Sequence, residues 1–457
     1  MRLRETLGID GSVAYAFLAR LVSIAGSTGT VLLIVRFLSP IEQGYYYTLL
    51  SLVSMQMVFE LGFSFVIQQL AAHESVHLEM KANGAVCGDA VAHARLASTL
   101  QLSLRWYTVA AAVMGLLLAP LGTFFFARHA TGAAMQVAWQ GPWLSAVAAS
   151  MAGLWCMPFY SFLEGCGQVR AVAALRLRQA IAASLLAWSA LLLHHGLYAP
   201  TLVIVGQVIT GLCFLAMHRP LLMGLLHHAV GQDAIRWHLE VWPFQWRMAV
   251  SWMCSYFTVQ IFIPILFALR GAVEAGQMGM SLSITAYMTV LALAWTSTKA
   301  TPFGRMIARR EFRALDQLFF TTFRQSLAVF AGIAVGSVLL VLVLPAVAPH
   351  LATRMLPARL FGLLVLGAAA NHVVQSLGIL LRCFKQEPFV VQSLVVALLT
   401  LLLAGMTASR WGNAGAVCSY LAVAAGVALP SAAMIFIRTR REYLAVQTFT
   451  PCEGDAV

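Results

Sequence analysis

Apolar runs of about 20 residues recur along the whole chain, and they constrain its fold more than any other feature. A membrane accepts such a run as a helix, because a helix closes every backbone hydrogen bond within its own segment. The 457 residues are 60% hydrophobic and only 10% charged, which is more apolar surface than a soluble core can bury. The sequence therefore predicts an all-α, polytopic membrane protein. About twelve transmembrane helices are expected, near residues 13–38, 44–70, 106–127, 141–163, 179–195, 198–218, 248–269, 276–300, 326–349, 358–382, 388–409 and 413–437.

The basic residues are shared unevenly between the loops. Most of the 29 Lys and Arg residues fall in loops on the side that holds both ends of the chain. Loops rich in Lys and Arg stay in the cytoplasm, so both termini are predicted to be cytoplasmic. The basic residues behind the net charge of +12 are thus accounted for by their place in cytoplasmic loops. Membrane lipids are therefore the expected partners, and no nucleic acid is expected.

Two short matches indicate that the last six spans repeat the first six. Residues 42–45 align with 274–277, where each half enters its second span, and residues 163–168 align with 381–386, where each half ends its fourth. Chance similarity between apolar segments is the alternative explanation. A duplicated bundle of this kind holds its substrate between the halves and rocks one half against the other. The predicted parts are an N-terminal six-helix bundle (1–218), a cytoplasmic inter-bundle linker (219–247), a C-terminal six-helix bundle (248–437) and a cytoplasmic tail (438–457).

The motifs of common enzymes and metal sites are missing from the sequence. There is no phosphate loop, no HExxH and no GxSxG pattern, and the eight cysteines form no CxxC pair. We therefore expect a protein that is not an enzyme and that holds neither a metal nor a cofactor. The sequence leaves open whether H⁺ or Na⁺ is used as a coupling ion.

Two charged residues lie inside predicted spans. Arg20 in the first span and Glu60 in the second fall at similar depths on the cytoplasmic half. A charge in hydrocarbon is costly, so such residues usually face the bundle interior and serve the function. Both are therefore predicted to bind substrate. The alternative is that Arg20 reaches to the lipid headgroups and that Glu60 becomes protonated.

Other polar residues and helix breakers add to the candidate site. Asn371, His372 and Gln375 fall on about one face of the tenth span. Hydrogen bonding between helices would explain these three residues equally well. Gly26 and Gly29 make the first span thin and flexible, and Pro264 interrupts the seventh span, so these residues are predicted hinges. The further substrate-binding candidates are Gln56, Arg247, Lys299, Asn371, His372 and Gln375.

Four segments carry a family resemblance. Residues 36–47 (RFLSPIEQGYYY) and 59–62 (FELG), followed by 242–247 (WPFQWR) and 382–389 (RCFKQEPF), resemble the O-antigen and polysaccharide flippases. These flippases belong to the multidrug/oligosaccharidyl-lipid/polysaccharide (MOP) exporter superfamily, which also contains the MATE drug antiporters. With the matching span count, the likeness covers most of the chain.

The resemblance implies a V-shaped pair of six-helix bundles in a bacterial inner membrane. Such a protein would move an undecaprenyl-diphosphate-linked oligosaccharide from the cytoplasmic to the periplasmic leaflet, and its partners would include a polysaccharide polymerase and chain-length machinery. Arg20, Arg247 and Lys299 would then meet the diphosphate, because cationic side chains suit phosphate groups.

Two other functions remain as alternatives. A cation-coupled multidrug antiporter would need an acidic, aromatic-lined cavity, and Glu60 is almost the only acid within the predicted spans. A membrane-embedded polymerase or ligase would normally carry a large periplasmic loop. The longest loops here, near 71–105 and 219–247, are short and are predicted to be cytoplasmic.

Overall fold

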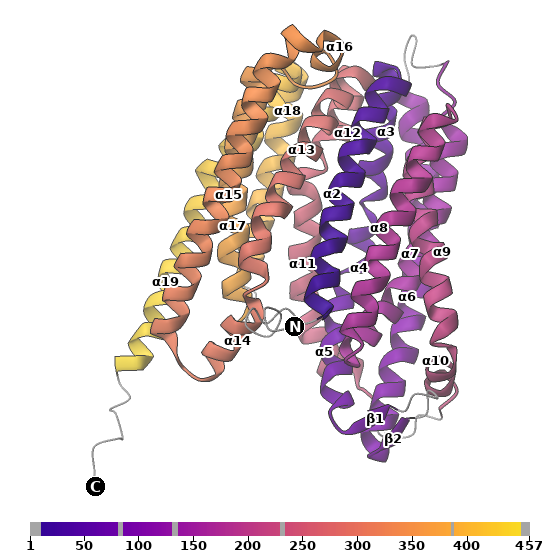
Figure 1. The fold of residues 1–457 in the computed structure, drawn as a ribbon, viewed down its shortest axis with the longest axis vertical. Helices are drawn as coiled ribbons and strands as arrows, with labels where there is room; N and C mark the ends of the chain where they lie inside the picture. Colours follow the sequence, from indigo (N-terminus) through magenta and orange to yellow (C-terminus); the bar gives the residue numbers. More distant parts are fainter. Residues whose placement is uncertain (1–10, 81–85, 130–135, 229–233, 385–387, 449–457) are drawn as a thin grey trace. The chain divides into compact units, whose positions relative to one another are not determined.

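The computed structural model describes residues 11–80, 86–129, 136–228, 234–384 and 388–448, nearly all of them in helices (Figure 1). These residues form two compact units, Met1–Met253 and Cys254–Val457. Parts of the predicted linker and tail, and residues 385–387 of the last family motif, lie outside the described residues. The predicted boundaries of the bundles, linker and tail therefore stay predictions.

Long helices run side by side in the first unit (Figure 1). Two short antiparallel strands follow the second span and pair Leu78 with Gly88. The elements are α2 (Gly11–Phe37), α3 (Pro40–Val53), α4 (Gln56–Glu60), α5 (Phe63–Ser75), β1 (Leu78–Met80), β2 (Val86–Gly88), α6 (Ala90–His129), α7 (Gln140–Gly165), α8 (Val169–Leu192), a 3₁₀ turn (Gly196–Tyr198), α9 (Ala199–Met217), α10 (Arg219–Leu226), a π-helical turn (Trp237–Val241) and α11 (Trp242–Val259), which continues into the second unit.

The second unit is built from helices throughout its described residues. Its largest buried cluster is rich in phenylalanine and includes Phe303, Phe319 and Phe436. The elements are α12 (Phe262–Arg270), α13 (Ala272–Ser297), α14 (Ala300–Ala308), α15 (Phe312–Val347), α16 (Pro349–Ala352), α17 (Ala358–Arg382), α18 (Val390–Val423), a π-helical turn (Ala424–Ala428) and α19 (Leu429–Thr448).

The expected number of spans is confirmed once one long stretch is divided. Among the described residues, nine helices are long and apolar enough to cross a membrane, and two bent pairs raise the number to eleven. The stretch Val390–Leu444 holds two spans, because the backbone leaves helical geometry at Gly412 (φ 56°, ψ −134°). The Thr407 hydroxyl donates to the Gly415 carbonyl at 2.9 Å, whereas eight residues of continuous helix would rise about 12 Å. The chain therefore reverses at Gly412, and the described residues contain twelve spans.

Glycines in α2 allow close packing against α8. A Cβ atom at Gly26 would lie 2.0 Å from the Ser184 hydroxyl, and one at Gly29 would lie 2.7 Å from the Trp188 ring. The Trp188 indole donates to the Thr30 hydroxyl at 3.1 Å. Helix α2 runs unbroken through both glycines. Their observed role is thus close packing, and their role as hinges stays a prediction.

The seventh span is bent close to Pro264. Helices α11 and α12 meet at an angle of 41°, with the break between Val259 and Phe262. Proline has no backbone N–H, so Pro264 cannot bond to the Gln260 carbonyl one turn earlier. The bend is therefore explained locally, whereas movement about it stays a prediction.

Candidate functional site

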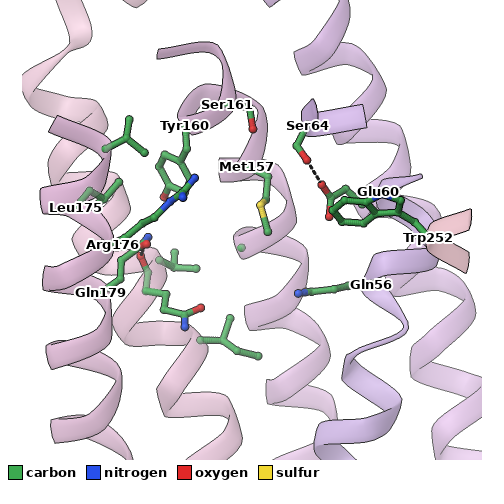
Figure 2. A pocket seen from close by; sticks show the side chains of 15 residues that line it. Gln56, Glu60, Ser64, Met157, Tyr160, Ser161, Leu175, Arg176, Gln179 and Trp252 are labelled. Atoms are coloured by element: carbon green, nitrogen blue, oxygen red, sulfur yellow. Dashed lines mark hydrogen bonds between the residues drawn. The ribbon is translucent and has the colours of Figure 1, made fainter. Parts of the chain in front are cut away.

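A polar pocket opens among the membrane-spanning helices of the first unit (Figure 2). Its volume is about 360 Å³, within the range of small-molecule sites. The lining mixes amides, hydroxyls, one acid, one cation and aromatic rings. The lining residues are Gln56, Glu60, Ser64, Gly153, Met157, Tyr160, Ser161, Val172, Leu175, Arg176, Gln179, Ile204, Gln207, Val208 and Trp252.

Helical periodicity explains why these residues meet. Helix α7 contributes positions 153, 157, 160 and 161, and α8 contributes positions 172, 175, 176 and 179. Residues spaced by three, four or seven share one face of a helix. Gln56 and Glu60, four residues apart on α4, share a face in the same way. The pocket thus lies where one face each of α4, α7, α8 and α9 converge.

Glu60 lies at a break in the second span. Leu61 (φ 55°) and Gly62 (φ 64°) both adopt left-handed geometry, and α5 leaves α4 at 43°. For Leu61 this conformation costs about 1–2 kcal/mol, and such strain is most often found at functional sites. The Glu60 side chain is buried, at 5% exposure, and accepts a hydrogen bond from the Ser64 hydroxyl.

Trp252 lies over this break. A Cβ atom at Gly62 would lie 3.3 Å from the Trp252 ring, so glycine at this position leaves room for the indole as well as favouring the left-handed turn. The half-buried indole lines the pocket beside Glu60 (Figure 2). The break and the tryptophan together form one wall of the pocket.

The opposite wall carries the pocket's cation. Arg176 and Gln179 on α8 lie across from Gln56 and Glu60 (Figure 2). The Arg176 guanidinium donates to the Glu164 carboxylate at 2.6 Å. Gln179 donates to the Gln207 carbonyl at 3.1 Å. Both side chains on this wall are therefore held in place by neighbours.

Three polar side chains in the pocket are available to a ligand. Within the described part of the chain, the side chains of Gln56, Ser161 and Gln207 have no hydrogen-bond partner. A primary amide offers two donors and one acceptor oxygen, and a hydroxyl offers one donor and two acceptor sites. The pocket can thus form several neutral hydrogen bonds to a ligand.

The structure brings two of the eight predicted substrate-binding residues together, namely Gln56 and Glu60. Arg20 on α2 is exposed and is not among the residues that line this pocket. Arg247 is also exposed, with its guanidinium 5.6 Å from the Trp246 ring centre. Lys299 is exposed just before α14. The binding roles of these three cations stay predictions.

The three candidates on α17 differ in exposure. His372 is fully buried, bonds to Ser326 at 3.1 Å and stacks on Phe330. Gln375 is exposed and Asn371 is half-buried. His372 thus packs inside the second unit, and its predicted binding role, like those of the other two, stays a prediction.

Several lining residues were not predicted from the sequence, for different reasons. The fifth span was expected to begin at residue 179, which leaves Arg176 in the loop before it, but α8 begins at Val169. Gln207 offered a usable signal, since it is the one amide in the apolar helix Ala199–Met217. Tyr160 and Trp252 gave no such signal, because their rings are largely apolar and do not stand out within a hydrophobic span.

Metal binding finds no support in the described residues. No group of three or more His, Cys, Asp and Glu side chains there could hold a metal ion. The pocket itself offers a single carboxylate.

The similarity of this chain to known proteins lies in its fold. The sequence matches no protein-family model and no curated protein. Solved structures with similar folds include the lipid II flippase MurJ (10% identity, TM-score 0.58, 97% of this chain and 94% of that one) and the MATE multidrug transporter DinF-BH (13%, 0.59, 95% and 96%). Another is a MOP-superfamily transporter from Pyrococcus furiosus (13%, 0.52, 96% and 97%), whose binding pocket is described as having reverse polarity.

These comparisons define the class of fold. Over nearly its whole length the chain has the fold of MOP-superfamily transporters, which confirms the predicted all-α, multi-pass membrane architecture. Flippases and drug transporters both have this fold, so the fold alone does not define a function.

Proposed function

We propose that this protein is a flippase that moves an undecaprenyl-diphosphate-linked oligosaccharide from the cytoplasmic to the periplasmic leaflet of a bacterial inner membrane. The observation that carries the proposal is the polar pocket among the membrane helices, with the free amides of Gln56 and Gln207. The fold supports it, since the similar structures include a lipid flippase.

The pocket offers the hydrogen bonds that a sugar headgroup needs in order to leave water. A sugar headgroup cannot enter hydrocarbon without replacing the hydrogen bonds it makes with water. Amide and hydroxyl groups arranged inside a membrane protein supply such replacements. The indole of Trp252 offers an apolar face for the carbon side of a sugar ring. The lipid tail need not enter the pocket at all.

Exposed cations outside the pocket are proposed to meet the diphosphate. Arg20 lies on α2 and Arg247 on α11, and both have exposed side chains. Guanidinium groups bind phosphate through paired hydrogen bonds. Transport would then proceed by alternating access, with the bend before Pro264 as one place where a helix can flex.

A multidrug antiporter is the second candidate, and one observation favours it. Glu60 lies beside Trp252, and a buried carboxylate next to an aromatic ring suits a lipophilic cation. Similar folds include multidrug transporters. On this account, cells that overproduce the protein would resist organic cations and expel ethidium faster than control cells.

Deletion of the gene separates the two functions. The flippase proposal predicts that lipid-linked oligosaccharide accumulates on the cytoplasmic leaflet and that surface polysaccharide is lost, while ethidium efflux stays unchanged. The chain expressed from a plasmid should restore the surface polysaccharide. Normal surface polysaccharide in the deletion strain would overturn the proposal, and lost ethidium efflux would support the antiporter.

A further inference from the structure

The pocket lacks the excess positive charge of an anion-binding site. Glu60 is the one acid and Arg176 the one cation among its lining residues. Arg176 is already paired with Glu164 at 2.6 Å. If Glu60 is ionised, the pocket and this partner carry net negative charge; if Glu60 is protonated, they are neutral. In neither state does the pocket offer the excess positive charge that a diphosphate requires.

We infer that this pocket is a subsite for an uncharged saccharide, and that the diphosphate of the same lipid stays outside it. The inference rests on the proposed function and deepens it by assigning one part of the cargo to one site. Gln56 and Gln207 are its specificity-determining residues, and Glu60 repels acidic groups when it is ionised.

The free hydrogen-bonding groups suit such a ligand. A neutral sugar presents hydroxyls that both donate and accept, and the amides of Gln56 and Gln207 do the same. These two amides come from different helices, α4 and α9. A ring bound between them would therefore be held from two sides, with the Trp252 indole along the wall (Figure 2).

The burial of Glu60 gives the site its selectivity. Its side chain is 5% exposed and bonded to Ser64, so water screens it poorly. When Glu60 is ionised, a sugar carboxylate or phosphate placed beside it meets a like charge with little screening. In that state the site should favour neutral sugar residues over uronic acids.

Two lipids that differ only in the saccharide test the assignment. The full-length protein in lipid nanodiscs is titrated with undecaprenyl diphosphate and with the same lipid bearing a neutral oligosaccharide, purified from cells. The double variant Gln56→Leu/Gln207→Leu should bind the saccharide-bearing lipid at least tenfold more weakly and the bare lipid with little change. Gln69→Leu, an exposed amide of α5 outside the pocket, is the matched control and should bind both lipids like the wild type.

The possible failures can be told apart. An equal loss for both lipids in the double variant would show that the amides contact the diphosphate, and no loss for either would show that they contact neither part. Either result overturns the saccharide subsite but does not contradict the proposed flippase function. If the wild type binds neither lipid more tightly than phosphatidylglycerol, the proposed function fails together with the subsite.

Discussion

Glu60 is the residue on which the chemistry of the pocket most depends. It is buried, accepts a hydrogen bond from Ser64, lines the pocket, and lies directly before the strained turn at Leu61 and Gly62. Its place in a membrane span singled it out in the sequence, because an isolated acid is costly in hydrocarbon. The turn itself was not predicted, since leucine rarely adopts left-handed geometry and only Gly62 hinted at it.

Substitution of Glu60 tests its polar role. Glu60→Leu removes the acceptor for Ser64 and places an apolar side chain in the pocket, whereas Glu60→Gln keeps the shape and an acceptor. Glu60→Leu also removes an acceptor that the pocket offers to a ligand, and a hydrogen bond of about 1.4 kcal/mol corresponds to roughly tenfold in affinity. Glu60→Leu should therefore reduce export of surface polysaccharide at least tenfold, and Glu60→Gln should reduce it much less. Export is measured at matched membrane levels, and full export by Glu60→Leu would contradict the role.

Helices of this protein have ends and packing partners that the sequence predicts only in part. The expected tenth span, 358–382, coincides with α17 (Ala358–Arg382), whereas the fifth, expected from residue 179, begins at Val169. Hydropathy marks the apolar run and not a helix that continues beyond it. The pairing of α2 with α8 was not predictable. Helices that are apolar all round carry no stripe that marks their neighbours, and packing in a membrane depends on small residues and shape.

Glycines in contact with rings should be sensitive to a single added carbon. A Cβ atom at Gly122 on α6 would lie 2.1 Å from the Trp143 ring, whereas one at Gly336 on α15 would have no neighbour within 4 Å. Gly122→Ala should therefore lower stability by about 1–3 kcal/mol through overpacking. Gly336→Ala should leave stability unchanged or raise it by up to about 1 kcal/mol, through helix propensity. Thermal unfolding in detergent compares the two, and equal midpoints would refute the packing model.

A cluster of ion pairs holds the segment before α11 against the first unit. Arg95 on α6 binds both Glu74 on α5, at 2.8 Å, and Glu240 in the π-helical turn. The Ser98 hydroxyl accepts the backbone N–H of Ile235 at 3.1 Å. This segment was expected to be a linker. Its contacts are side-chain bonds between residues far apart in sequence, which composition cannot reveal.

The pH dependence of this cluster follows from Glu240. Hydrogen bonding to Arg95 lowers the pKa of Glu240 below its usual value of 4.5. Its stabilising contribution is therefore complete above about pH 4.5 and is lost as the pH falls through the lowered value. Because Glu240 is partly exposed, Glu240→Gln should cost only about 0.5 kcal/mol at pH 7 and nothing at low pH. Arg95→Met leaves buried Glu74 without this partner and should cost about 1–3 kcal/mol. Unfolding midpoints at pH 7 and pH 3 measure both effects; a Glu240→Gln penalty that grows at pH 3 would contradict the assignment.

The whole molecule is defined by twelve membrane-capable helices within the described residues, divided between two units. The number of spans could be predicted, because the length of an apolar run is fixed by the thickness of the membrane. The pocket could be predicted only in part. Gln56 and Glu60 were found from their polarity, but the residues across from them depend on how α7, α8 and α9 pack.

The central claim is that the pocket carries the saccharide of a lipid across the membrane, and reconstituted vesicles test it most directly. A fluorescent, neutral lipid-linked oligosaccharide is placed in both leaflets, and a membrane-impermeant glycosidase is added outside. We expect vesicles with the wild-type protein to lose nearly all of the saccharide, and those with Gln56→Leu/Gln207→Leu to lose mainly the outer-leaflet share. Cleavage limited to the outer leaflet with the wild-type protein, as in protein-free vesicles, would contradict the claim.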